Sequence, residues 1–154
     1  MVAYIASYKQ THPKEPKLLR GARLLIDGVR NKKLTTKYSH DNIVDVNLGS
    51  YAVDCSGFVN TILISQQLHK ALQEIQSFIE KIENVPKPIA PLQPWPLHYV
   101  LFLQSEVSKK CWKPVMDARL LEPGDIVAYT RNNHENSSSE DGQHVMIVSD
   151  KIKH

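Results

Sequence analysis

Two residue types able to perform covalent chemistry stand out: a cysteine in the stretch YAVDCSGFVN and a histidine in GQHVMIV. A cysteine attacks a carbonyl carbon as its thiolate, whereas an ordinary thiol is mostly protonated at neutral pH. The start of a helix and a nearby histidine both favour the thiolate. Cys55 comes directly before an apolar helical pattern, Gly57 allows close approach of the backbone, and His144 begins an apolar strand pattern. These features indicate a cysteine enzyme.

The same residues also have a purely structural interpretation. Free cysteine is among the most often buried residue types, and seven histidines make a Cys–His pair easy to find. His134 and His144 could bind a metal, but the sequence around them lacks the usual HExxH or CxxC spacing. No metal and no cofactor are therefore expected. Cys111, beside two lysines, is interpreted as a packing residue. A Cys55–Cys111 disulfide would require an oxidising compartment.

The elements that must position Cys55 are predicted from apolar periodicity. Apolar residues recur every three or four positions from Leu18 to Val29, which predicts an amphipathic helix. Residues 32–50 lose this period and predict a loop with one short strand at Ile43–Val46. After Cys55 a helical period continues to Ile82, either as one long helix or as two segments that break at Ser65–Gln67.

The second half of the chain predicts a connector and a β-hairpin. Five prolines within residues 86–96 predict an extended connector or lid. Residues 97–107 favour a helix. A Pro-Gly pair predicts a turn into a strand at Ile126–Tyr129, and the polar residues 131–143 join it to a second strand, HVMIVS. Helices first and strands last predict an α+β fold with an antiparallel sheet.

Three blocks of sequence resemble, in the same order, the signature blocks of the NlpC/P60 superfamily of papain-like cysteine peptidases. They are DCSGFV at 54–59, PGDIVAY at 123–129 and QHVMIV at 143–148. The resemblance implies a single papain-like NlpC/P60-type domain over residues 1–154, with N-terminal helices packed on a small antiparallel sheet. It also implies a helical and proline-rich insertion at about residues 66–110, which could wall the cleft.

The resemblance assigns roles by position. Cys55 matches the nucleophile and His144 the general base. Asp54 and Ser56 match substrate-binding residues that, in relatives which cut bacterial cell-wall peptides, help to hold the free amino end. A third polar residue usually follows the histidine by about a dozen positions, whereas this chain ends ten residues after His144. His154 is a weak match, so a truncated C-terminus is one interpretation.

The function that this resemblance implies is a cysteine hydrolase. It would cleave an amide or peptide bond through an acyl-enzyme, with fragments of bacterial cell-wall peptidoglycan as the substrate class. Two alternatives stay open. One is an amidase or acyltransferase on a lipid or another amide, and the other is a catalytically silent binding module with the same fold.

The composition of the chain limits the classes of partner that can be expected. The net charge of +3 comes from 19 basic and 16 acidic residues that are scattered along the chain, so no nucleic-acid partner is expected. No apolar run reaches the roughly 18 residues of a membrane span, and the N-terminus lacks the pattern of a signal peptide. A cytoplasmic protein and an exported protein without its leader both fit this sequence, which also leaves the oligomeric state open.

Overall fold

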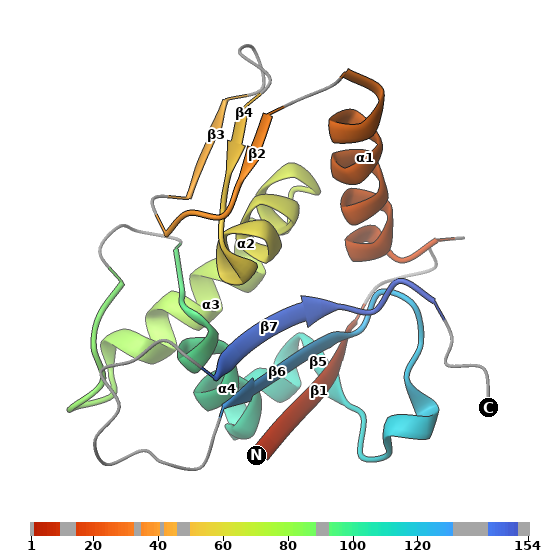
Figure 1. Cartoon of the computed structure of the whole chain (residues 1–154). Coiled ribbons are helices and arrows are strands. Elements are labelled where there is room, and N and C mark those ends of the chain that lie inside the picture. Colours follow the sequence, from red (N-terminus) through yellow and green to blue (C-terminus); the bar gives the residue numbers. More distant parts are fainter. Residues whose placement is uncertain are drawn as a thin grey trace.

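The computed structural model describes residues 2–9, 15–32, 35–40, 42–45, 50–88, 93–130 and 142–150, which form a mixed α+β structure with two small sheets (Figure 1). The α+β class is therefore confirmed. The helices are α1 (Lys17–Lys32), α2 (Cys55–Ser65), α3 (His69–Glu80) and α4 (Pro96–Gln104), with short 3₁₀ helices at Glu106–Lys110 and Ala118–Leu120. The strands are β1 (Val2–Tyr8), β2 (Thr35–Lys37), β3 (Ile43–Asp45), β4 (Ser50–Ala52), β5 (Trp112–Pro114), β6 (Ile126–Thr130) and β7 (Gln143–Ile147).

The larger sheet has the order β5-β1-β6-β7, and all its neighbouring strands are antiparallel. β1 lies inside this sheet, with Ala6 opposite both Pro114 and Ile126. The expected order of helices first and strands last is therefore wrong at the N-terminus. The segment VAYIASY is apolar at most positions and does not alternate, so its pairing depends on strands that follow more than a hundred residues later.

The smaller sheet has the order β2-β4-β3 and stands beside α1, above the larger sheet in Figure 1. β4 pairs in parallel with β2 and antiparallel with β3. The strand expected at Ile43–Val46 is confirmed as β3. β2 and β4 were not expected, because strands of three residues are too short to show a period of two.

The predicted helices are confirmed, and so is the β-hairpin. The helical period after Cys55 forms two helices, α2 and α3, with a turn at Gln66 and Gln67 between them. The apolar segment after the prolines forms α4. β6 and β7 pair as an antiparallel hairpin, and most of the polar segment that joins them, residues 131–141, lies outside the described residues.

Residues 66–88 and 93–110 contribute to the core of the molecule. Ile75 and Ile79 of α3 and Tyr99 and Phe102 of α4 are completely buried in the same apolar cluster as Ile126 of β6. α4 packs on β1, β6 and β7, while α2 packs on α1 and β7. The described parts of the proline-rich segment are residues 86–88 and 93–96, which lie against this core. Residues 89–92 lie outside the described part of the chain.

The turn before β6 is fixed by its glycine and aspartate. Gly124 has φ +95°, and a Cβ added there would lie 2.6 Å from the Cβ of Pro16, so a side chain would be strained at this position. The buried Asp125 carboxylate accepts hydrogen bonds from the Ser7 hydroxyl and, at 2.9 Å, from the Glu122 N–H. The PGD block therefore ties β6 to β1.

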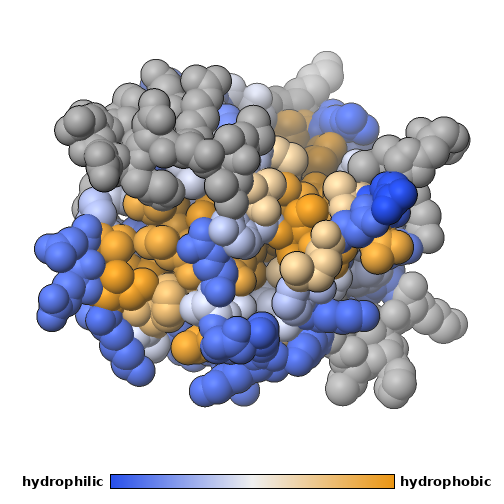
Figure 2. Space-filling view, turned by 90° about the horizontal axis from the view of Figure 1, so that it is seen from below, coloured by the Kyte–Doolittle hydropathy of each residue, from blue (hydrophilic) through white to orange (hydrophobic). Residues whose placement is uncertain are grey.

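The face of the larger sheet that is turned away from α2 and α4 carries a row of apolar residues. Ile5, Val127 and Met146 lie opposite one another in a row across β1, β6 and β7. Figure 2, which views the molecule from below, shows hydrophobic residues gathered across this side. In the described part of the chain, no helix is both long and apolar enough to cross a bilayer.

Candidate functional site

Cys55 is the first residue of α2 and lines a small cavity of about 100 Å³ at the start of that helix. Its side chain is half-buried, so the sulfur is neither a packed core atom nor fully in solvent. We call this cavity the Cys55 pocket. Its lining residues are Tyr38, His40, Asp54, Cys55, Ser56, Trp95, Pro96 and Gln143.

Asp54 explains why α2 begins at Cys55. Its backbone is extended, and its Oδ1 accepts hydrogen bonds from the Gly57 N–H at 2.7 Å and from the Ser56 hydroxyl at 2.8 Å. A carboxylate at this position satisfies one of the unpaired N–H groups of the first turn and interacts favourably with the helix dipole. Asp54 and Ser56 are thus brought together with Cys55, as the sequence motif requires.

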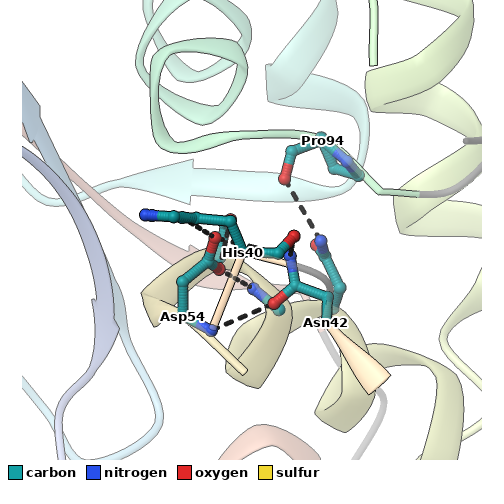
Figure 3. Close-up of polar contacts among 7 residues, drawn as sticks. His40, Asn42, Asp54 and Pro94 are labelled. Atoms are coloured by element: carbon teal, nitrogen blue, oxygen red, sulfur yellow. Dashed lines mark hydrogen bonds and ion pairs between the residues drawn. The ribbon is translucent and has the colours of Figure 1, made fainter. Parts of the chain in front are cut away.

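The second carboxylate oxygen of Asp54 faces the segment before β3. Asp54 Oδ2 lies 3.1 Å from His40 Nδ1 and 3.4 Å from Asn42 Nδ2, while the Asn42 side-chain oxygen accepts the Asp54 N–H at 3.0 Å (Figure 3). Burial alone would raise the pKa of Asp54, but the hydrogen bonds from Gly57, Ser56, His40 and Asn42 outweigh it and hold the pKa below its usual range. The pocket therefore contains an ionised carboxylate whose two oxygens are both hydrogen-bonded.

Gly57 permits this contact between α2 and the segment before β3. A Cβ added at Gly57 would lie 1.7 Å from the side-chain oxygen of Asn42. Any larger residue would displace Asn42, and with it the acceptor of the Asp54 N–H. The glycine of the DCSG motif is required here for the close approach that the sequence predicted.

The surroundings of Cys55 have two opposite effects on the pKa of its thiol. Burial raises its pKa above the usual value, and the negative charge of Asp54 raises it further. The nearby backbone N–H groups of Val145, Ser56 and Cys55 itself favour the thiolate and lower the pKa, but by less. The net result is a raised pKa, whereas the sequence led us to expect a thiolate favoured by the helix start and His144.

His144 is placed beside the site but faces another direction. Along β7 the side chain of Val145 is buried, whereas His144 is exposed and lies opposite Tyr129 of β6, with ring centroids 5.5 Å apart. Successive side chains of a strand point to opposite faces, so Gln143 and Val145 face α2 and His144 faces the outer side of the sheet. Gln143 lines the Cys55 pocket, and His144 is not among the residues that line it.

His40 is the histidine that the structure places in the Cys55 pocket. It lies between β2 and β3, fourteen residues before Asp54, and its ring is in edge contact with Tyr38 at 5.2 Å. His40 was not predicted as a site residue, because a histidine in a polar loop belongs to no periodic pattern and to no motif. Only the small sheet, which was not expected, brings it back to the start of α2.

Trp95 and Pro96 form another wall of the Cys55 pocket. Their segment is held in place because buried Asn60 of α2 donates to the Pro94 carbonyl at 3.1 Å (Figure 3) and accepts from the Tyr99 hydroxyl at 2.6 Å. His98, completely buried, accepts the Trp95 N–H at its Nδ1 and donates from Nε2 to the Pro86 carbonyl. The proline-rich segment thus reaches the site through fixed polar contacts.

The remaining candidates lie away from the site or outside the described residues. Cys111 and Cys55 are both free, so they form no disulfide with each other. The pKa of Cys111 is raised by burial and by the carboxylate of Glu74, which does not suggest a reactive thiol. His134 and His154 lie outside the described residues.

Comparison with known proteins finds no family model, no curated protein and no solved structure that matches this chain. The fold and the site themselves define an α+β protein with a half-buried cysteine at the start of a helix. A histidine and an ionised carboxylate lie in the same pocket as that cysteine.

Proposed function

We propose that the chain is a cysteine hydrolase that cleaves an amide bond, with Cys55 as its nucleophile. The observation that supports this most strongly is the position of half-buried Cys55 as the first residue of α2, in a pocket that also contains His40 and the ionised Asp54. Backbone N–H groups at the start of this helix would stabilise the negative charge that develops on a carbonyl oxygen during attack.

The proposed reaction has two stages, acylation of Cys55 and hydrolysis of the acyl-enzyme. A histidine takes the thiol proton of Cys55 while the sulfur bonds to the amide carbon, and the carbonyl oxygen becomes an oxyanion. The C–N bond then breaks, and the histidine returns the proton to the leaving amine. Water, activated by the same histidine, hydrolyses the resulting thioester, which releases the acid and restores the thiol.

Two histidines are candidates for this base, on separate grounds. The sequence motif assigns His144, which directly follows Gln143, a residue that lines the Cys55 pocket. The geometry of the pocket favours His40, because it lines the same pocket as Cys55 and its Nδ1 contacts Asp54. The proposal requires one of them, and their variants decide which.

The proposed substrate class is a short peptide of bacterial cell-wall type with a free amino end. It rests on the resemblance of the DCSG, PGD and QHV blocks to NlpC/P60 peptidases. The structure adds one supporting feature, since the ionised Asp54 at the Cys55 pocket would attract an ammonium group. The amidase or acyltransferase alternative would use the same cysteine on another amide.

A second candidate function is a binding module that uses the Cys55 pocket for recognition alone. Two observations favour it: the raised pKa of the Cys55 thiol, and the exposed position of His144 on the outer side of the sheet. A binding module would need no proton transfer, so loss of His144 would change its ligand affinity modestly or not at all.

The experiment compares wild type with Cys55→Ala, His40→Ala and His144→Ala on muropeptide mixtures. Products are identified by mass spectrometry and folding is checked by circular dichroism, with the exposed His69→Ala as the matched control. We expect no turnover from Cys55→Ala, a loss of about a hundred- to ten-thousand-fold from the variant of the true base, and full activity in the control.

The outcomes separate the proposals. Turnover at the wild-type rate in folded Cys55→Ala contradicts the hydrolase. Muropeptide binding by all the proteins, without any cleavage, supports the binding module. If wild type neither cleaves nor binds muropeptides but does cleave N-acyl amide substrates in a Cys55-dependent way, the amidase replaces the peptidase.

A further inference from the structure

A second and larger cavity, of about 400 Å³, lies between α1, the small sheet and the first turn of α2. We call it the α1 pocket. It is distinct from the Cys55 pocket, although Tyr38 lines both. Its lining residues are Leu25, Ile26, Val29, Arg30, Thr36, Lys37, Tyr38, Tyr51, Val53 and Phe58.

The α1 pocket exists because α1 is only partly packed on the core. Leu18 and Ala22, in its first half, are buried, whereas Leu25 and Val29 are half-buried and Ile26 is 39% exposed. The apolar stripe of the helix thus continues beyond the part that α2 covers. Apolar surface of this kind gains free energy when a ligand removes it from water.

Two cations are among the residues that line the α1 pocket. Arg30 belongs to α1 and Lys37 to β2, so they approach the α1 pocket from two different elements, and both are exposed. No acidic side chain is among the described residues that line the pocket. An apolar cavity lined by two cations is complementary to an amphipathic anion.

We propose that the α1 pocket binds a single-chain alkyl carboxylate, a fatty acid of about ten carbons, with its chain against Leu25, Val29 and Phe58 and its carboxylate between Arg30 and Lys37. The volume lies within the range of pockets that hold small organic ligands, about 300–1,000 Å³. This inference does not depend on the hydrolase proposal, because no residue of the α1 pocket takes part in the chemistry of Cys55. Tyr38, which lines both cavities, connects the bound chain to the Cys55 pocket.

The test is titration calorimetry of the full chain with decanoate, decan-1-ol and butanoate, all kept below concentrations at which they aggregate. Decanoate should bind saturably at one site, and the neutral alcohol and the short acid should bind much more weakly. The double variant Arg30→Gln with Lys37→Gln should weaken decanoate roughly tenfold or more, since it removes both charged partners. Lys113→Gln, an exposed cation on β5, is the matched control and should bind as wild type does.

A second variant tests the apolar part of the α1 pocket. Ile26→Asp places a negative charge in the pocket at a side chain that is already 39% exposed, so the fold should survive. We expect it to abolish decanoate binding. The proposal is overturned if wild type shows no saturable binding, if decanol binds as well as decanoate, or if folded Ile26→Asp binds decanoate normally.

Discussion

At the scale of single residues, Cys55 shows that a motif can predict the position of a residue without predicting its pKa. The helix start and its N–H groups are where DCSG predicted them. The sequence did not show how deeply the sulfur is buried, nor that Asp54 stays ionised beside it, and both effects raise the pKa of the thiol. The free protein therefore holds Cys55 mainly as a thiol near neutral pH.

The pH dependence of alkylation tests this. In a Cys111→Ser variant, the rate at which iodoacetamide labels Cys55 should keep rising through about pH 8.5, the usual pKa of a thiol, because burial and Asp54 delay ionisation. Asp54→Asn removes the neighbouring charge and should move the midpoint to lower pH. Labelling followed by mass spectrometry measures both profiles, and a plateau reached below pH 7 in the Cys111→Ser protein would contradict the raised pKa.

At the scale of elements, prediction from the sequence succeeded where a pattern repeats over several turns. α1 and α3 show a helical period, and β6 and β7 are apolar strands next to clear turn signals. β1, β2, β4 and β5 were missed, because their pairing depends on residues distant in the sequence and their own patterns are short or do not alternate. The site was affected in the same way: Asp54, Cys55 and Ser56 are neighbours in sequence, whereas His40 reaches them only through the small sheet.

The proline-rich segment and α4 give a prediction for acid stability. Burial lowers the pKa of His98, and the charge of Lys87 adds to this, while the hydrogen bond to the Pro86 carbonyl opposes it. The unfolded chain binds a proton on His98 near pH 6.5, and the folded chain binds it only at lower pH. Stability contributed by neutral His98 is thus present above about pH 6.5 and is lost as the pH falls through the folded pKa.

Urea unfolding at several pH values between about 5 and 7.5 measures this effect. His98→Gln should be less stable than wild type at neutral pH, because the contacts to Trp95 and Pro86 are weakened. It should also lose less stability on acidification. Identical pH slopes for the two proteins would show that His98 does not titrate differently in the folded and unfolded chains.

At the scale of the whole molecule, one apolar cluster extends from α1 to β7 and includes α3 and α4. Loss of a core side chain in α3 should therefore weaken the entire structure. Ile79, completely buried, is a suitable position, and Ile64 of α2, 42% exposed, is its matched control. Ile79→Ala should lower the free energy of unfolding by about 2–5 kcal/mol, and Ile64→Ala by much less.

Thermal unfolding followed by far-ultraviolet circular dichroism and by tryptophan fluorescence checks this prediction. Trp95 and Trp112 report on the proline-rich segment and on β5, and both should change at the same temperature as the helical signal. Two separate transitions, with only one shifted by Ile79→Ala, would mean that the segment with α3 and α4 unfolds independently of the rest.

The central position of β1 has a consequence for how the chain is made. β1 is synthesised before both of its partner strands, since Ala6 pairs with Pro114 and Ile126. At about 5–20 residues per second, roughly 6 to 24 s pass before the partner strands exist. During that time an apolar segment remains without its sheet, and pairing across so many residues is intrinsically slow. The nascent chain should therefore depend on chaperones that shield β1, and refolding from denaturant should give the highest yield at low protein concentration.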